Sequence, residues 1–164
     1  MPRNKPLKKI VKAIVLVLIV CIGYFTFDRC YVSNELPSFE YAMTNNASFT
    51  NDNVPYGKKT VFIYFTTDCP DCKAINNYLD YFKSISDHVT IVLVAKETTT
   101  KNLIEFFDIR ELSDFTGYIL LDQYDDFPSD FDLGISYSFP VLKAYDENQC
   151  LIPSIRSLGD LSKI

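Results

Sequence analysis

Residues 66–73 read TTDCPDCK, and the rest of the chain is organised around them. Two cysteines, Cys69 and Cys72, are separated by two residues and follow directly after a dense apolar run. An amphipathic segment begins at the second cysteine, so both sulfurs are expected at a strand-to-helix junction. That placement favours dithiol redox chemistry, although zinc sites use the same cysteine spacing.

The segments around the dithiol predict a βαβ unit. Residues 61–65 read VFIYF without alternation, which predicts a strand buried on both faces. After Cys72, apolar residues recur at three- and four-residue steps and predict a helix of about four turns. Residues 66–68 are good N-cap types, and Pro70 is tolerated in a first helical turn. Residues 89–95 read VTIVLVA and predict the second buried strand.

The later part of the chain predicts shorter elements. Residues 101–115 have the periodicity of a helix, and residues 118–121 are too short to classify. Residues 139–145 and 150–155 flank a polar turn and predict an antiparallel hairpin. Residues 159–164 begin a short closing helix.

The N-terminal segment predicts membrane attachment. Residues 10–27 are apolar apart from Lys12, and five basic residues, Lys12 included, crowd their N-terminal side. Positive flanks stay on the cytoplasmic side, so residues 1–9 are expected in the cytoplasm and the bulk of the chain outside it. The segment of 18 residues is near the lower limit for a span, which leaves a cleaved signal peptide as the alternative. The bulky residues that follow lack a small-x-small cleavage pattern, which favours a retained anchor.

The charge of the chain bears on its partners. From residue 31 onward there are 10 Lys and Arg against 20 Asp and Glu, a net charge of −10. Such a surface repels phosphate backbones, so nucleic acid is not expected as a partner. Acidic residues cluster between Asp122 and Asp132 and predict a solvated loop; calcium is the alternative, but the turn glycine of a calcium loop is missing. His88, the only histidine, is interpreted as a residue at a strand entrance and not as a metal ligand.

Three further cysteines lie outside the motif. Cys21 falls within the proposed span as a small apolar residue. Cys30 and Cys150 are each either a free thiol or half of a structural disulfide. Disulfides persist outside the cytoplasm, which favours a redox role for Cys69 and Cys72.

The order of elements resembles the thioredoxin-like superfamily. Two motifs carry the resemblance: CPDC at residues 69–72, and GISYSFPVL at residues 134–142, which is similar to the family's cis-proline segment. The resemblance implies an α/β three-layer fold with a central mixed sheet over residues 60–164. It also implies an insertion around residues 98–132. The prolines, glycine and asparagines between residues 34 and 59 predict a connector over residues 28–59, with at most one short element around residues 39–43.

A narrower resemblance is to small membrane-anchored extracytoplasmic thioredoxin-like proteins of Gram-positive bacteria, including the bacteriocin-accessory type. It implies a thiol-disulfide oxidoreductase without a cofactor that acts on exported protein or peptide substrates and is served by a redox partner protein. Phe139 and Pro140 are the implied substrate-binding residues. The chain departs from the family pattern at Asp68, where a tryptophan is usual, and at Ile63, where a buried acid is usual.

The two thiols are expected to have different roles. Cys69, exposed at the helix N-terminus, is predicted to attack, and Cys72, one turn further in, is predicted to resolve the mixed disulfide. Asp68 and Asp71 are predicted to tune the pair, because a neighbouring carboxylate raises the pKa of a thiol. A less stabilised thiolate disfavours the reduced form, so the pair is expected to serve as a reductant or isomerase.

Two other classes of function remain open. The first is a non-catalytic thioredoxin-like binding or accessory module for an exported peptide or protein, with the cysteines as ligands or as a static disulfide. The second is a structural or immunity-type membrane protein in which the motif locks the start of a helix. A zinc site would need two further ligands, and the sequence offers no second C-x-x-C.

Overall fold

The computed structural model describes residues 12, 14–21, 35–97, 99–107 and 114–164. The chain divides into two units, Met1–Glu35 and Leu36–Ile164. In the first unit residues 14–21 are helical, with exposed apolar side chains. Among the described residues, no helix is long and apolar enough to cross a membrane. Parts of the predicted span over residues 10–27 lie outside the described ranges, as do the predicted cytoplasmic tail and Cys30.

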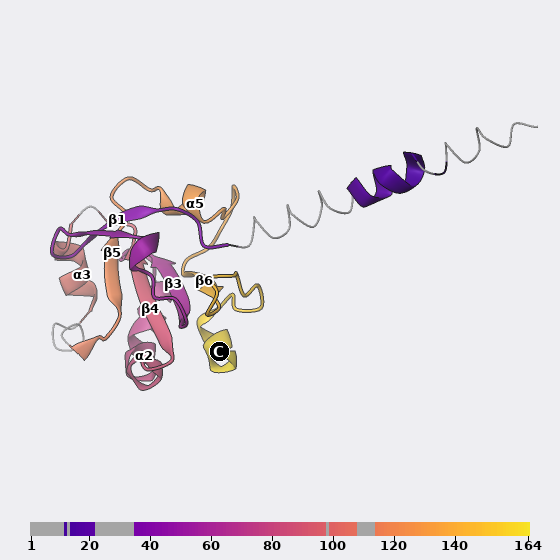
Figure 1. Cartoon of the computed structure of the whole chain (residues 1–164). Helices are drawn as coiled ribbons and strands as arrows, with labels where there is room; N and C mark the ends of the chain where they lie inside the picture. Colours follow the sequence, from indigo (N-terminus) through magenta and orange to yellow (C-terminus); the bar gives the residue numbers. More distant parts are fainter. Residues whose placement is uncertain (1–11, 13, 22–34, 98, 108–113) are drawn as a thin grey trace, which may run out of the picture. The chain divides into compact units, whose positions relative to one another are not determined.

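The second unit is built on a six-stranded mixed sheet with the strand order β2-β1-β5-β4-β3-β6 (Figure 1). Its strands are β1 (Glu40–Met43), β2 (Ser48–Thr50), β3 (Lys59–Phe65), β4 (Val89–Ala95), β5 (Tyr118–Leu121) and β6 (Val141–Tyr145). β3, β4 and β5 run parallel to one another. β6 lies antiparallel to β3, and β1 lies antiparallel to both β5 and β2. The predicted central mixed sheet is therefore confirmed.

β3 is buried on both faces, as its unbroken apolar run predicts. Successive side chains of a strand point to opposite faces of the sheet, so β3 feeds two cores. Val61, Ile63 and Phe65 belong to one core, which also holds Cys72 and the apolar side of the helix that follows it. Phe62 and Tyr64, on the other face, pack among aromatic rings from β1, β2 and α5.

The helical segments are η1 (Asn51–Asn53), η2 (Asp71–Tyr78), α2 (Leu79–Ile85), α3 (Lys101–Phe106), α5 (Phe127–Asp130) and η3 (Leu158–Lys163). The single α-helix predicted after Cys72 is instead the 3-10 segment η2 followed by α2. Asn76 and Asn77 lie in η2, and the Asn76 side chain donates a hydrogen bond to the Phe106 carbonyl at 3.2 Å. Asparagine has a low intrinsic helix propensity, so two in succession weaken a regular α-helix at this point.

The helix predicted after β4 forms in part, and the unclassified run that follows it is a strand. α3 is shorter than the helix predicted over residues 101–115, because Phe107 adopts an extended backbone conformation at its end. Residues 108–113 lie outside the described ranges. The run at residues 118–121 forms β5, which pairs with β4.

Residues 36–59 form part of the folded unit, where the sequence predicts a connector. They supply β1, β2 and η1, where the sequence predicts at most one short element. Phe39, Tyr41 and Phe49 are almost fully buried, and the Phe39 ring lies 5.4 Å from that of Tyr41 and 5.6 Å from that of Phe131 between centroids. The compact unit therefore begins at Leu36, because these rings form part of the core.

The predicted C-terminal hairpin forms only in part. β6 supplies its first strand, but the return consists of a single bridge between Tyr145 and Leu151. The Ile152 N–H then donates to the Ala144 carbonyl at 2.7 Å. The next residue, Pro153, has no N–H with which to continue the ladder, so the second predicted strand is wrong.

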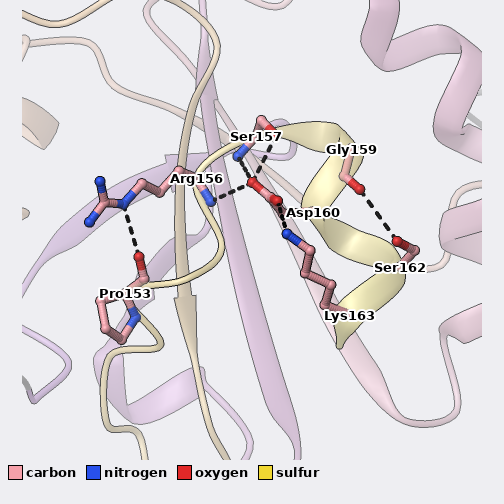
Figure 2. A network of polar contacts seen from close by, with 7 residues as sticks. All are labelled: Pro153, Arg156, Ser157, Gly159, Asp160, Ser162 and Lys163. Atoms are coloured by element: carbon pink, nitrogen blue, oxygen red, sulfur yellow. Dashed lines mark hydrogen bonds and ion pairs between the residues drawn. The ribbon is translucent and has the colours of Figure 1, made fainter.

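The C-terminal segment η3 is short but capped (Figure 2). The Asp160 carboxylate accepts hydrogen bonds from the Ser157 hydroxyl at 2.8 Å, the Ser157 N–H at 3.1 Å and the Arg156 N–H at 3.3 Å. Lys163 pairs with the other oxygen of the same carboxylate. These contacts, the Lys163 hydrogen bond foremost, hold the pKa of Asp160 well below its ordinary value.

An alanine at Gly117 should destabilise the protein. Its Cβ would lie 2.2 Å from the Ile91 carbonyl oxygen, a backbone atom of β4. We expect Gly117→Ala to lower the free energy of unfolding by roughly 2 kcal/mol in urea denaturation. The matched control is Gly159→Ala, where the nearest atom is the Ser157 hydroxyl oxygen at 3.8 Å. Equal effects of the two substitutions would contradict the packing reason.

Asp160 should make the stability of the protein depend on pH in the acidic range. Its pKa is lower in the folded chain, so its contribution is present above the ordinary aspartate pKa of about 3.9 and is lost as the pH falls toward the folded value. We expect Asp160→Asn to lower the urea midpoint at neutral pH and to approach wild type below about pH 4. A difference that stays constant across this range would show that the carboxylate charge is not responsible.

Candidate active site

Cys69 and Cys72 lie at the carboxyl end of β3, as the sequence predicts. β3 ends at Phe65 and η2 begins at Asp71, so Cys69 lies in the loop between them and Cys72 lies in the first turn of η2. Cys69 is partly exposed, whereas Cys72 is fully buried in the core. A partner disulfide can therefore reach Cys69 but not Cys72.

The start of η2 is not capped as predicted. Residues 66–68 are good N-cap types, but the N-cap position is occupied by Pro70, which makes no side-chain hydrogen bond there. The Thr67 hydroxyl and N–H donate instead to the Glu97 carboxylate. A charged acceptor at the neighbouring strand end forms the stronger hydrogen bond, and it draws the threonine away from the helix.

The two thiols lie near disulfide-bonding distance of each other. The Cys72 N–H donates to the Cys69 sulfur, with 3.2 Å between the nitrogen and Sγ. On another side, the Cys69 thiol donates to the Phe139 carbonyl oxygen at 3.8 Å. A backbone N–H directed at a sulfur stabilises negative charge on it, which is the requirement for an attacking thiolate.

The buried thiol has a strongly perturbed pKa. Burial raises the pKa of Cys72 to about 12, and the hydrogen bond with Cys69 adds to the effect. A backbone hydrogen bond from Thr66 acts in the opposite direction, and the charge of Asp71 raises the pKa further. Ile63 lies in the same core cluster as Cys72, and β3 contains no acidic residue that could take the thiol proton. The resolving thiol must therefore lose its proton without help from this strand.

The Phe139–Pro140 peptide bond is cis, as the resemblance implied. The Phe139 ring packs against Tyr64 and Tyr137, with centroid distances of 5.2 Å and 5.4 Å. This packing holds the Phe139 carbonyl beside the Cys69 sulfur. The substrate-binding role of Phe139 and Pro140 stays a prediction.

Asp68 and Asp71 are both exposed next to the motif. Asp71 lies in the first turn of η2 and raises the pKa of Cys72 through space, which is the direction predicted for it. The tuning role of Asp68 stays a prediction.

Glu97 belongs to the site, and the sequence reasoning missed it. It follows β4 almost directly, and β4 pairs in parallel with β3 so that Ala95 lies opposite Phe65. Its carboxylate binds Thr67 through one oxygen and accepts a hydrogen bond from the Asn102 side chain through the other, at 2.8 Å. Its position two residues after the predicted strand 89–95 was the available signal. The carboxyl ends of parallel strands meet at one edge of a sheet, so residues that follow the two strands should lie close together.

A second polar cluster lies on the opposite face of β3. The Tyr64 hydroxyl is 2.9 Å from a carboxylate oxygen of Asp122 and 2.9 Å from one of Asp125. Lys96 pairs with Asp125 at 2.6 Å and holds the pKa of that carboxyl below its ordinary value. Asp122 is 2% exposed and accepts the Phe127 N–H at 3.1 Å.

The acidic segment is thus tied to the sheet, where the sequence predicts a solvated loop. Asp122 is buried and anchors the segment that carries α5. Within the part of the chain that the structure describes, no group of His, Cys, Asp and Glu side chains is placed to hold a metal ion.

Two residues that the sequence singled out lie away from the site. Cys150 is a partly buried free thiol, which agrees with the first of its two predicted states; Cys30 lies outside the described residues. His88 is exposed directly before β4, which agrees with its interpretation as a residue at a strand entrance.

Comparison with known proteins places the fold. No family model and no curated protein sequence matches the chain. The thioredoxin domain of a thiol-disulfide oxidoreductase from Bacteroides vulgatus superposes with a TM-score of 0.63 at 18% identity, over 80% of this chain and 92% of that one. A secreted Mycobacterium tuberculosis disulfide oxidoreductase homologous to E. coli DsbE gives a TM-score of 0.59 at 18% identity, over 76% and 92%. The chain therefore has the thioredoxin-like fold and resembles bacterial thiol-disulfide oxidoreductases in structure at low sequence identity.

Proposed function

We propose that the protein is a thiol-disulfide oxidoreductase that works through Cys69 and Cys72. The observation that carries the proposal is the 3.2 Å contact of the Cys72 N–H with the Cys69 sulfur, at a site where Cys69 is accessible and Cys72 is buried. This asymmetry suits a pair with one attacking and one resolving thiol. The similarity of fold to disulfide oxidoreductases supports the same chemistry.

Exchange by this pair takes two steps. In the first, the Cys69 thiolate attacks one sulfur of a substrate disulfide, forms a mixed disulfide and releases one substrate thiolate. In the second, Cys72 loses its proton and attacks the Cys69 sulfur. The mixed disulfide breaks, the second substrate thiolate leaves, and a Cys69–Cys72 disulfide forms. Two electrons pass from the dithiol to the substrate.

The site suits a reductant or isomerase better than a strong oxidant. A strongly oxidising dithiol owes its potential to a stabilised reduced form. Burial and Asp71 act against negative charge on Cys72, so this thiol adds no thiolate stabilisation to the reduced state. The pair thus lacks, at Cys72, the feature that makes a dithiol strongly oxidising, and donation of electrons is favoured.

We further propose that the protein acts outside the cytoplasm, on thiols and disulfides of exported proteins or peptides. Residues 10–27 would anchor it as a single span with a cytoplasmic N-terminus. The support is the apolar segment with basic residues on its N-terminal side. A redox partner protein would return the pair to its dithiol form, because each reduced substrate removes two electrons.

Insulin reduction tests the proposed chemistry. We expect the full-length chain, purified in a mild detergent, to accelerate the reduction of insulin by dithiothreitol, and Cys69→Ser to lower the rate to that of dithiothreitol alone. The reason is that Cys69 is the accessible thiol that makes the first attack.

Cys150→Ser is the matched control, because it removes a free thiol that lies outside the motif. It should retain the activity of the parent chain. Equal activity of the parent and Cys69→Ser would refute the oxidoreductase and favour a binding module. Oxidation of a reduced substrate without any reduction of insulin would contradict the proposed direction alone.

Trapping tests the proposed substrates. In Cys72→Ser the second step is blocked, so Cys69 should retain its substrate as a mixed disulfide that mass spectrometry can identify. We expect exported proteins or peptides among the adducts in cells of the source organism, and none in Cys69→Ser. Adducts made up entirely of cytoplasmic proteins would contradict the proposed location.

A further inference from the structure

Glu97 connects the dithiol loop to the segment after β4. β3 and β4 run parallel with Phe65 opposite Ala95, and the Lys96 N–H donates to the Phe65 carbonyl at 2.8 Å. Beyond this hydrogen bond the segments that follow β3 and β4 leave the sheet as separate loops. The Glu97 side chain reaches from one loop to the other.

The Glu97 carboxylate uses both of its oxygens. Oε1 accepts the Thr67 N–H at 3.3 Å and also accepts the Thr67 hydroxyl. Oε2 accepts a hydrogen bond from Nδ2 of Asn102 at 2.8 Å, and Asn102 lies in the first turn of α3. Hydrogen bonds to an ionised acceptor are stronger than neutral ones, so the carboxylate holds Thr67 at a fixed place relative to α3.

The residue next to Thr67 is bound to the dithiol. The Thr66 carbonyl accepts the Cys69 N–H at 3.3 Å, and the Cys69 sulfur in turn accepts the Cys72 N–H at 3.2 Å. A backbone hydrogen bond of Thr66 also favours the thiolate of Cys72, whereas Cys69 and Asp71 disfavour it. Because the main chain of Thr66 and Thr67 is continuous, a shift of Thr67 moves this backbone and changes the placement of Cys69 relative to Cys72, on which the resolving step depends.

We propose that Glu97 is a positioning residue for the resolving step of disulfide exchange, and that it acts through its hold on Thr67. The inference rests on the proposed function of the dithiol. Glu97 acts on the loop and not on the reacting sulfurs, and the step it serves is the attack of the Cys72 thiolate on the Cys69 sulfur. In that step the bond from Cys69 to the substrate sulfur breaks, the Cys69–Cys72 bond forms, and the substrate leaves as a thiolate. The proton of Cys72 balances the charge of the departing substrate thiolate.

The two steps can be separated with an aromatic disulfide, 5,5′-dithiobis(2-nitrobenzoate). Attack by Cys69 releases a first coloured thionitrobenzoate and leaves a mixed disulfide. Attack by Cys72 on that mixed disulfide releases a second one. Stopped-flow absorbance of the reduced full-length chain therefore reports the two rates as separate phases. The parent chain for this experiment carries Cys21→Ser, Cys30→Ser and Cys150→Ser, so that Cys69 and Cys72 are its only thiols.

We expect Glu97→Ala to slow the second phase by about tenfold and to leave the first phase within about twofold of the parent. Glu97→Gln keeps an oxygen that accepts both Thr67 hydrogen bonds, so it should restore most of the second rate. Thr67→Val, which loses the hydroxyl but keeps the N–H, should have an intermediate effect. Glu105→Ala is the matched control, because it removes an exposed carboxylate from α3 and should change neither phase.

Several results would overturn the inference. If folded Glu97→Ala shows the same first-phase and second-phase rates as the parent, Glu97 has no positioning role. If both phases slow equally, the substitution loosens the loop in general and does not act on the resolving step. Failure of Glu97→Gln to recover would show that hydrogen bonding to Thr67 is not the cause. If Glu97→Ala does not fold by circular dichroism, Thr67→Val with a normal second phase refutes the inference. A parent chain that releases no second thionitrobenzoate would refute the proposed dithiol function itself.

Discussion

The in-register parallel pairing of β3 with β4 is the interaction on which the rest of the site depends. Both strands are buried along nearly their whole length, so a shift by one residue would place every side chain in the wrong core. This register leaves the dithiol loop and Glu97 at the same edge of the sheet. On the other side of β3, the pairing of Tyr64 with Val141 brings Pro140 to that edge as well. Three segments that are distant in sequence meet there because of strand register alone.

The same burial that fixes β3 also determines how the two cysteines differ. Cys72 packs in the core that contains Ile63, and a sulfur in such surroundings is hard to ionise. Cys69 lies three residues earlier, at the margin of that core, where the Cys72 N–H and the Phe139 carbonyl both face it. One of these groups donates and the other accepts, so the exposed sulfur has a partner in either protonation state. The packing of η2 into the core therefore determines two properties at once. It stabilises the fold, and it makes one thiol accessible and the other buried.

Much of this arrangement could be predicted from the sequence, because its signals are local. The unbroken apolar runs predicted β3 and β4, and the spacing of Cys69 and Cys72 predicted where the thiols lie. Other features depend on pairing between distant segments, which a single sequence does not display. Glu97 is one of these, since its partner Thr67 is known only when β3 and β4 are aligned. The aromatic residues of β1 and β2 are another, because prolines and asparagines surround them and each strand is too short for its alternation to be recognised.

The edge strands of the sheet determine how readily other polypeptides could pair with it. β2 has three residues, and the last residue of the other edge strand, β6, is already bridged to Leu151. A short edge strand such as β2 offers few free backbone groups to a passing extended chain, and the return segment covers the end of β6. At these places an unfolded polypeptide with exposed strand-forming segments would find little to join by β-addition. Its cysteines could approach the partly exposed Cys69 thiol without pairing with β2, which is a useful separation for any fold that must handle incompletely folded chains.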